Sequence, residues 1–495
     1  MAGRMEPPTA TLPAHVDVLI VGAGISGISA AYHLQTRCPG RSYLILEARD
    51  AIGGTWDLFR YPGVRSDSDM HTLGFSFQPW TGEKAIADGA AIRDYVQETA
   101  RVHGIDRRIR FGTRVTSAAW SGDTARWRVE GVGPDGAFSL TASFIDLCAG
   151  YYDHEHGHAP SFAGADSFSG RIVHPQQWPA DLDHRGRRVV VIGSGAPAVT
   201  LVPALAAQAA HVTMLQRSPS YVVAMPAVDA VGAKLRRWLP ARAAYALIRA
   251  KNVAVGLATF TLARRWPDRV ARHIIARAQQ AIGSAHDAGI HFTPRYRPWD
   301  QRLCLSPDGD LFAALRDGRA SIVTDTIDRF VPEGIRLASG GTIPADLIVT
   351  ATGLSVKMAG GITFAVDGRP IGLAGRLLYR GMMFEGVPNL IHTFGYTNAS
   401  WTLKADLTAV YLCRLLQRMQ RTRTRSVVPI NDDPTLTIQP FLSFTSGYIA
   451  RNADELPVQG SRTPWRLHQN YLRDVLVLRH SSLRSAAKDG LRFIR

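Results

Sequence analysis

Two groups of small residues with the spacing GxGxxG or GxGxxA each follow a short run of β-branched residues. They are Gly22, Gly24 and Gly27 in the first group and Gly193, Gly195 and Ala198 in the second. The first glycine allows a sharp turn after a strand, the second lets a pyrophosphate approach the backbone, and the third small residue lets the next helix pack on the sheet. The sequence therefore predicts two dinucleotide sites in one chain.

The residue at the tip of the second strand of each unit distinguishes the two nucleotides. Glu47 ends the apolar run 43–47, where a carboxylate binds ribose hydroxyls. The corresponding run, 211–216, ends instead in Arg217, and an arginine there suits a ribose that carries a 2′-phosphate. We therefore expect FAD at the first site and NADPH at the second, with a solvated surface charge as the alternative interpretation of Arg217.

Two α/β units are needed to position these motifs. The run 16–21 is typical of a buried parallel strand, and the runs 144–150 and 345–353 predict two similar closing strands. The predicted fold class is α/β, with two Rossmann-like dinucleotide-binding domains, one for FAD and one for NADPH, and a helical insertion. The expected order is a disordered tail (1–14), the FAD-binding domain (15–150), the NADPH-binding domain (151–224), an Arg-rich helical insertion (225–290), the second part of the NADPH-binding domain with the Arg302 loop (291–374), and the second part of the FAD-binding domain with the C-terminal region (375–495).

Cysteine usage disfavours redox and metal chemistry at thiols. The four cysteines, Cys38, Cys148, Cys304 and Cys413, are isolated from one another, with no CxxC and no metal-ligand spacing. We expect them to be reduced and structural, and no metal site is predicted. A disulfide reductase would share both glycine motifs, but the cysteine pair that it needs near the flavin is missing.

The net charge of +16 is not accounted for by two nucleotide sites alone. No basic stripe with interleaved aromatic residues is present, so a nucleic-acid partner is not predicted. The segment 251–264 is apolar with basic flanks and too short to span a bilayer. We favour a buried helix over one that lies in a membrane interface. Residues 1–14 lack the apolar core of a signal peptide, so we expect a cytoplasmic protein, with peripheral contact at the inner face of the membrane as the alternative.

The most specific segment of the chain lies between the two units. Phe168, Gly170, His174, Trp178 and Pro179 match the pattern FxGxxxHxxxWP, the fingerprint of type I Baeyer–Villiger monooxygenases. A second pattern of that family, GGxW followed by YPG and an aspartate, is complete in residues 53–67. The chain thus resembles this family over nearly its whole length beyond the tail, and most closely its actinobacterial branch of ethionamide-activating type.

The resemblance implies a reaction and roles for two residues. In the family, NADPH reduces FAD, dioxygen adds to the reduced flavin, and the resulting peroxide inserts an oxygen atom into a hydrophobic ketone to give an ester or lactone. Arg302 corresponds to the cation that stabilises the peroxide, and Asp67 to the acid that holds it. The alternatives are a surface ion pair for Arg302, and a turn-capping role for Asp67 with Asp69 in its place. His174 is implied to couple cofactor binding to domain position rather than to donate a proton.

The resemblance also implies the cofactor contacts. For FAD they are Gly22, Gly24, Ser26, Gly27, Glu47, Gly54, Thr55, Trp56, Asp57, Leu58, Asp67 and Val115. For NADPH they are Gly193, Ser194, Gly195, Ala196, Pro197, Ala198, Val199, Thr200, Arg217 and Ser218, with Arg65 and Ser66 near the nicotinamide. Two departures stand out: Gln301 occupies a position where many members have a lysine for the 2′-phosphate, and Pro197 removes one N–H group from the second loop.

The expected function is therefore an NADPH- and O2-dependent flavin monooxygenase that oxygenates a hydrophobic ketone and also oxidises thioethers or thioamides. Two alternatives remain: a flavin monooxygenase restricted to sulfur and nitrogen, and a membrane-associated flavin-binding protein with little turnover. The Trp178-Pro179 ending argues against the first, and the presence of Arg302 and Asp67 argues against the second. The sequence makes no prediction of the oligomeric state.

Overall fold

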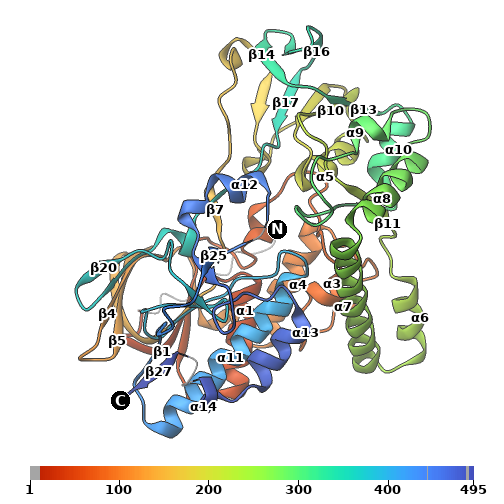
Figure 1. Ribbon diagram of the computed structural model, residues 1–495. Helices are drawn as coiled ribbons and strands as arrows, with labels where there is room; N and C mark the ends of the chain where they lie inside the picture. The colour runs from red at the N-terminus through yellow and green to blue at the C-terminus, as the bar shows by residue number, and fades with distance from the viewer. Residues whose placement is uncertain (1–11, 443, 487–489) are drawn as a thin grey trace.

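The computed structural model describes residues 12–442, 444–486 and 490–495. Two α/β units lie one above the other in Figure 1, each around its own sheet, so the predicted fold class is confirmed. Residues 1–11 of the predicted tail lie outside the described residues. Leu12 packs against the core of the first unit, and the carbonyl of Ala14 accepts a hydrogen bond from the amide of Thr141 (3.0 Å).

The first unit contains a parallel sheet built around β1 (His15–Val21). This strand lies between β2 (Tyr43–Leu46) and the end of β6 (Gly136–Leu147), and β3 (Ile109–Arg110) and β23 (Leu390–His392) extend the sheet on its two sides. Because helices and a second layer of strands cover both faces, the strands are almost continuously apolar. The pairing of β23 with β6 brings the C-terminal region back to the first unit, as the sequence predicts.

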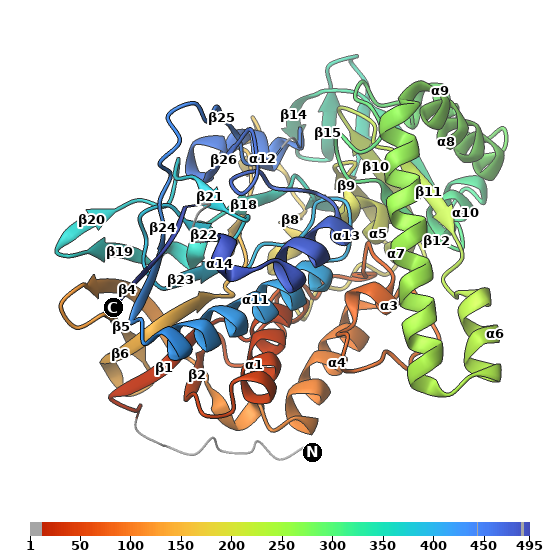
Figure 2. The same cartoon turned by 60° about the horizontal axis from the view of Figure 1, so that its bottom comes forward.

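Helices of the first unit cover one face of this sheet. α1 (Ile25–Arg37) packs beside the long α11 (Trp401–Thr422), as Figure 2 shows, and α4 (Gly89–Val102) lies next to α1. Two single-turn helices, α2 (Thr55–Leu58) and α3 (Met70–Leu73), follow the second strand. The segment that continues from β2 therefore passes across the carboxyl edge of the sheet.

An antiparallel layer covers the other side of the first unit. It consists of β4 (Arg114–Ser121), β5 (Arg126–Gly133) and the first half of β6, extended by β19 (Thr363–Val366) and β20 (Arg369–Ile371). The predicted boundary at residue 375 is therefore too late. The chain rejoins the first sheet at β19, because Phe364 of that strand is buried in the same core as Trp127.

The second unit is a five-stranded parallel sheet with the order β13–β10–β9–β17–β8. The strands are β8 (Arg171–Val173), β9 (Arg188–Ile192), β10 (His211–Gln216), β13 (Ala320–Thr324) and β17 (Leu347–Thr350). α5 (Ala196–Leu205) and α10 (Asp310–Arg316) pack together, and a small sheet of β14 (Ile327–Val331), β15 (Gly334–Leu337) and β16 (Thr342–Pro344) packs against one face of the parallel sheet. Residues on both sides of the predicted insertion therefore share one sheet.

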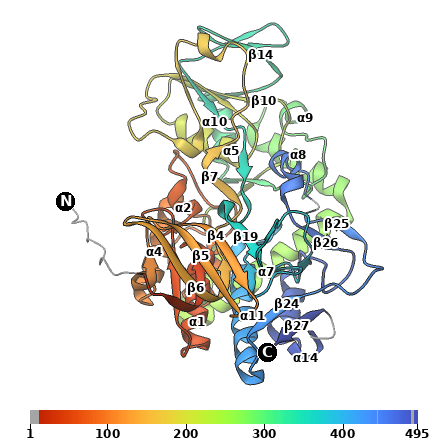
Figure 3. The same cartoon turned by 90° about the vertical axis from the view of Figure 1, so that its left-hand side faces the viewer.

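Two extended segments connect the units. β7 (Tyr152–Gly157) leads from the first unit to the second, and β18 (Leu354–Val356) leads back. They pair antiparallel, and the amide of His158 donates to the carbonyl of Gly353 (3.1 Å). Figure 3 shows β7 between the upper and lower units. Because both crossings are paired with each other, the two units are connected by a narrow double strand.

The C-terminal region packs over α11 and the sheet edge. Its elements are β21 (Leu378–Tyr379), β22 (Met383–Phe384), β24 (Ser426–Pro429), β25 (Ile438–Pro440), α12 (Gly447–Arg451), β26 (Val458–Gly460), α13 (Tyr471–Asp474), α14 (Leu483–Ala486) and β27 (Leu491–Ile494). A buried ion pair between Lys404 and Asp474 (2.7 Å) fixes α13 to α11. The four cysteines are all buried and unpaired.

Helices α6 (Ala230–Trp238), α7 (Ala241–Arg265), α8 (Pro267–Ile282) and α9 (Ala288–His291) occupy the segment where the sequence predicts a helical insertion. They lie between β11 (Val222–Met225) and β12 (Cys304–Pro307), which pair with each other. The interpretation of 251–264 as a buried helix is wrong. α7 is one helix of 25 residues that lies along the edge of the molecule (Figure 2), and only Ala263 of that segment is buried.

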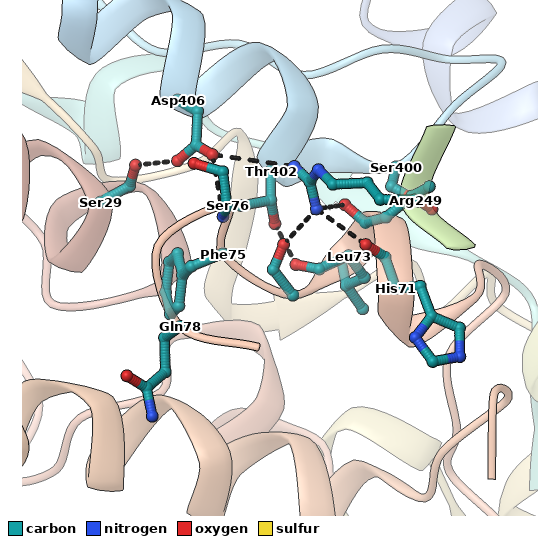
Figure 4. Close-up of polar contacts among 12 residues, drawn as sticks. Ser29, His71, Leu73, Phe75, Ser76, Gln78, Arg249, Ser400, Thr402 and Asp406 are labelled. Atoms are coloured by element: carbon teal, nitrogen blue, oxygen red, sulfur yellow. Dashed lines mark hydrogen bonds and ion pairs between the residues drawn. The ribbon is translucent and has the colours of Figure 1, made fainter. Parts of the chain in front are cut away.

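By length and composition alone, α7 is apolar enough to cross a membrane; among the described helices it is the single such candidate, and 11% of its apolar window is buried. Its first half is fixed to the first unit by Arg249, which Figure 4 shows reaching towards the α3 turn and α11. The guanidinium donates to the carbonyls of His71 (2.8 Å) and Gly74 (2.7 Å) and lies 3.7 Å from the carboxylate of Asp406. Burial alone would raise the pKa of Asp406, but His33 and Arg249 lower it overall to about 2.

We predict that Arg249→Met destabilises the protein by about 3–5 kcal/mol, because it removes the arginine cation beside the buried Asp406 carboxylate and the donor of two carbonyls. Urea unfolding of the FAD-loaded protein measures the change. Arg272→Met is the control, since Arg272 is exposed on α8 and should change stability by no more than about 0.5 kcal/mol. Equal stabilities of the two variants would contradict the anchoring role.

Candidate active site

A cavity of about 1390 Å³ lies between the two units, and both glycine loops open into it. Its wall includes the carboxyl ends of β1 and β9, the connecting strand β7, the start of α11 and the end of α12. Ligand sites of open parallel sheets form at such carboxyl ends. The cavity is large enough for more than one small molecule, because typical ligand pockets measure about 300–1,000 Å³.

The first loop leaves room for a phosphate next to the backbone. Gly22 has a φ of +107°, and a Cβ there would lie 2.7 Å from the carbonyl oxygen of Cys148. Gly24 faces Gly54, whose own Cβ would lie 3.2 Å from the Cα of Gly24. A Cβ on Gly27 would overlap the carbonyl of Gly22, so α1 packs against the loop only with glycine there. The sequence thus folds into the cradle that a pyrophosphate needs at the start of α1.

Glu47 follows β2 and closes the side of this cradle. Its carboxylate accepts hydrogen bonds from the amides of Ala23 (2.7 Å) and Arg49 (2.9 Å) and is buried. Burial raises the pKa of Glu47 despite these two bonds. Each carboxylate oxygen keeps a free lone pair, so Glu47 is placed to accept hydroxyl protons of a ribose beside the loop.

The second loop repeats the geometry at the end of β9. Gly193 has a φ of +141°, and a Cβ there would overlap the carbonyl of Ala351 in the adjacent strand. Pro197 lies in the first turn of α5, where an N–H group would have no partner within the helix. Ser194 and Ser220 form a hydrogen bond across the loop (3.0 Å). Both loops therefore fit dinucleotide phosphates, and they do so on opposite sides of one cavity.

Arg302 and Asp67 form an ion pair on the wall of this cavity. Arg302 also donates to the carbonyls of Thr397 (3.1 Å) and Ala399 (3.2 Å). Burial alone would lower the pKa of Arg302, but Asp67 and Tyr151 raise it overall, so the guanidinium keeps its charge. Asp69 instead caps α3 through the amide of Thr72 (3.0 Å), which settles the assignment in favour of Asp67.

Comparison with known proteins identifies the family. Residues 20–82 match the model of an NAD(P)-binding Rossmann-like domain. The chain is 53% identical to the FAD-containing monooxygenase EthA of Mycobacterium tuberculosis (strain ATCC 25618 / H37Rv) over 482 residues, 97% of this chain and 98% of EthA. It is 47% identical to the putative FAD-containing monooxygenase MymA of the same strain, over 94% of this chain and 95% of MymA. The chain belongs to the family of FAD-containing monooxygenases.

The fold agrees with this membership. A solved structure of oxidized steroid monooxygenase bound to NADP superimposes with a TM-score of 0.74 at 23% identity, covering 97% of this chain and all of that one. The predicted family, the FAD and NADPH cofactors and the flavin-monooxygenase class are thus confirmed. The sequence assigns FAD to the loop before α1 and NADPH to the loop before α5, and these loops are called the FAD cradle and the NADPH cradle below.

The NADPH cradle has a second cation that the sequence did not indicate. Arg217 is exposed at the end of β10, and both it and Arg451, at the end of α12, line the cavity. Burial and the charge of Arg217 lower the pKa of Arg451. No described carboxylate lies within 4.0 Å of either guanidinium. Gln301 also lines the cavity, but its amide donates to the carbonyl of Thr445 (3.4 Å).

Aromatic side chains of the monooxygenase gather beside Arg302. Tyr151 and Tyr152, which the sequence analysis missed, follow β6 and join through their hydroxyl groups (2.8 Å). Tyr151 stacks on Trp401, with ring centroids 5.7 Å apart. The indole N–H of Trp401 donates to Ser26 Oγ (2.8 Å) and so fixes the ring to α1. The sequence signal that could have indicated these two residues is a pair of tyrosines directly after the closing strand of the first unit.

The fingerprint segment lies outside the cavity, against the connecting strands. His174 accepts a hydrogen bond from the amide of Gln176 (3.2 Å), and its other ring nitrogen lies 3.3 Å from the carbonyl of Gly353. A Cβ on Gly157, at the end of β7, would overlap the His174 ring. Burial lowers the pKa of His174, so the ring is neutral at pH 7. His174 therefore touches both crossings between the units, in keeping with a role in domain position.

The structure brings most of the sequence-predicted residues to the cavity wall. They are Gly22, Gly24, Ser26, Glu47, Gly54, Thr55, Trp56, Arg65, Asp67, Val115, Gly193, Ser194, Gly195, Ala196, Pro197, Arg217, Ser218 and Arg302. Those that do not line it are Gly27, Asp57, Leu58, Ser66, Ala198, Val199, Thr200, Phe168, Gly170, His174, Trp178 and Pro179. The prediction that Asp57 contacts FAD is corrected, because its buried carboxylate pairs with Arg49 (2.5 Å) and Arg60 (2.5 Å).

The remaining corrections follow from packing. Ser66 donates to the carbonyl of Ser68 and is turned away from the cavity. Ala198, Val199 and Thr200 lie on the buried side of α5. Arg65 lines the cavity, but its guanidinium pairs with Asp310 (2.5 Å) at the start of α10. Arg65 therefore connects the first unit to the second through this ion pair.

We predict that Gly22→Ala lowers the FAD content of the purified enzyme at least about tenfold, because the new methyl group meets the Cys148 carbonyl at the cradle. Flavin absorbance per protein measures the effect. Gly136→Ala is a matched control, since Gly136 has nearly the same φ (+106°) but no atom within 4 Å of the added Cβ. We expect the control variant to lose about 1 kcal/mol of stability through backbone strain and to keep its full FAD content.

Proposed function

We propose that this monooxygenase catalyses Baeyer–Villiger oxygenation of hydrophobic ketones. In the balanced reaction, ketone, O2, NADPH and a proton give an ester or lactone, water and NADP⁺. One oxygen atom of O2 enters the bond between the carbonyl carbon and its neighbour, and the other leaves as water. The observation that carries the proposal is a guanidinium held by a carboxylate, Arg302 with Asp67, between the two nucleotide cradles.

FAD in the first cradle, once reduced by NADPH, supplies the electrons that activate dioxygen. The fixed positive charge of Arg302 has two effects on an oxygen nucleophile beside it. It keeps the reacting oxygen unprotonated by favouring its anionic form, and it stabilises the negative charge that develops on the carbonyl oxygen of the substrate. Asp67 holds Arg302 at the wall and prevents it from turning into solvent.

Arg302 can also change its contacts. Among the described residues, its partners besides Asp67 are the backbone carbonyls of residues 396–399. Neutral carbonyls are weaker partners for a guanidinium than a carboxylate, so these bonds can be exchanged for bonds to a ligand while the ion pair remains. Arg302 would then be free to turn towards a bound nicotinamide or towards the substrate.

The lining next to Arg302 supports an apolar substrate. Tyr151, Trp401 and Phe394 form a cluster of rings, with Phe394 5.5 Å from Trp401 between centroids. Burial raises the pKa of Tyr151 well above its ordinary value, so the hydroxyl stays neutral. Apolar rings exclude water, which protects a reactive oxygen nucleophile from protonation. Oxidation of thioethers or thioamides is proposed as a second activity, because the same site can present oxygen to a soft sulfur atom.

A direct test uses ¹⁸O2 with purified, FAD-loaded enzyme, NADPH, and either a long-chain ketone or an alkyl aryl thioether. We expect an ester with one labelled atom from the ketone, and a labelled sulfoxide from the thioether, each analysed by mass spectrometry. Sulfoxide without ester would overturn the ketone assignment while leaving the monooxygenase class in place. Hydrogen peroxide as the sole product with both substrates would overturn both activities.

We predict that Arg302→Ala lowers the rate of ester formation by about 10²–10³, the usual cost of removing one donor that stabilises a developing oxyanion. FAD content should not change, and NADPH oxidation should continue with release of hydrogen peroxide. Arg297→Ala is the control on the same loop, because Arg297 is exposed and does not line the cavity. Coupled ester formation in the Arg302 variant would remove this residue from the mechanism.

We further predict that Arg217 and Arg451 select NADPH over NADH by binding the 2′-phosphate. Arg217→Ala should raise KM for NADPH by about 10-fold to 100-fold, since a hydrogen bond to a charged group contributes about 1.5–3 kcal/mol. Arg451→Ala should act in the same direction. Neither change should alter KM for NADH, and steady-state kinetics with both cofactors separates a lost phosphate contact from general damage to the cradle.

A further inference from the structure

Most of the excess positive charge of the protein lies in one insertion. Residues 230–282, which form α6, α7 and α8, contain eleven Lys and Arg residues and one acidic residue, Asp268. The chain as a whole carries +16. The insertion therefore accounts for more than half of the net charge in about a tenth of the length, which two nucleotide cradles do not explain.

Many of these cations face solvent without an ion-pair partner among the described residues. Arg237, Arg242, Arg265, Arg269 and Arg272 are exposed. Within the described part of the chain, no carboxylate lies within 4.0 Å of any of them. Cations concentrated in this way produce a local positive potential that attracts an anionic surface. The partner of this face is therefore expected to carry negative charge.

The same insertion exposes apolar side chains along α7. Leu247, Ala254, Val255, Ala258 and Leu262 are exposed and recur at helical spacing, so they form one stripe. Val255 is 54% exposed. Exposed tryptophans stand at both ends of the helix, Trp238 (77%) before α7 and Trp266 (47%) after it. Apolar stripes flanked by Trp and Arg are typical of helices that lie in the headgroup region of a bilayer.

The contacts of α7 exclude a membrane-spanning arrangement. Tyr245, Ile248 and Arg249 are packed into the first unit, and Lys251 pairs with Asp229 (2.5 Å) at the start of α6. The first three of these residues occupy one side of the helix over its first half, whereas Lys251, four residues after Leu247, lies on the face of the stripe and is bound to α6. A spanning helix would be surrounded by lipid on all sides, and the buried Arg249 bonds would be broken. The helix can lie on a membrane with its exposed stripe, but it cannot cross one in this fold.

The exposed helix is next to the loop that carries Arg302. Arg264 pairs with Asp300 (2.6 Å), and Phe260 meets Trp299 edge to face, with ring centroids 5.7 Å apart. A surface that holds α7 would therefore also hold the 299–302 loop close to it. Apolar molecules dissolved in the surface would then have a short route to the cavity wall.

We propose that α6, α7 and α8 form a docking surface for an anionic lipid bilayer, with the α7 stripe in the headgroup region and the surrounding arginines on the lipid phosphates. A second copy of this chain is disfavoured as the occupant, because two insertions of high positive charge would repel each other. Nucleic acid would not need the apolar stripe. The surface is independent of the oxygenation chemistry, since no residue of the stripe lines the cavity.

The test is vesicle flotation of the full-length, FAD-loaded protein. The probes are vesicles of phosphatidylcholine alone and vesicles in which a third of the lipid is phosphatidylglycerol. We expect binding to be stronger to the anionic vesicles by about tenfold or more, and to fall with added salt. Equal binding to both kinds of vesicle, or none to either, would overturn the proposal.

Paired variants identify the surface. Val255→Glu with Leu262→Glu should abolish flotation, whereas Val132→Glu, at a valine that is also 54% exposed but lies on β5, should leave it unchanged. Arg265→Glu with Arg269→Glu should reduce binding by about tenfold or more, and Arg329→Glu with Arg336→Glu makes the same change in charge on the distant β14–β15 hairpin as the control. FAD content and NADPH oxidation report that each variant is folded.

Three outcomes contradict the proposal. The α7 variants could float like the wild type. They could instead change the sedimentation coefficient in the absence of lipid, which would assign the surface to a second copy. Tighter binding to duplex DNA than to anionic vesicles, unaffected by Val255→Glu with Leu262→Glu, would assign it to nucleic acid.

Discussion

The ion pair of Arg302 and Asp67 connects parts of the chain that are far apart in sequence. Asp67 comes from the segment after β2, Arg302 from the loop before β12, and the carbonyls that complete the guanidinium's bonds from the loop just before α11. A half-buried cation without a carboxylate would draw water into the cavity or turn to solvent. The pair therefore keeps a positive charge at the wall of the cavity, and the aromatic rings beside it keep the dielectric constant around that charge low.

The relative position of the two units is fixed at several places, including an apolar contact of Tyr61 and Val64 with the core of the second unit. β7 and β18 pair with each other, and the neutral His174 ring fits against Gly157 and Gly353 on the two crossings. Arg65 adds a bond from the first unit to Asp310 of the second. The two units thus meet through both the paired crossings and side-chain contacts, and the cavity lies between them.

Local rules were enough to predict the glycine loops, the strands, and the residues at the strand ends of the two units, Glu47 and Arg217. Gly22, Gly193 and Glu47 occupy their positions because a strand, a turn and a helix start succeed each other over a few residues. Asp57 shows where such reasoning ends. Asp57 follows Trp56 in the motif, but its carboxylate forms ion pairs with Arg49 and Arg60. Those pairings depend on how α2 packs, which the motif does not specify. Arg451 was beyond prediction for the same reason, because it reaches the NADPH cradle from a helix more than 200 residues away in sequence.

The exposure of α7 was the largest departure from the sequence analysis. Periodicity predicted a helix but could not say which side is covered, because α7 is apolar on much of its circumference. The structure resolves this through Arg249, whose bonds to the α3 turn and to Asp406 use one side of the first half and leave the rest free. An enzyme that only had to enclose a cavity could place polar residues on that free side at no loss of stability. The persistence of leucine, valine and flanking tryptophans there, beside the loop that carries Arg302, is accounted for if the insertion meets an apolar, anionic surface outside.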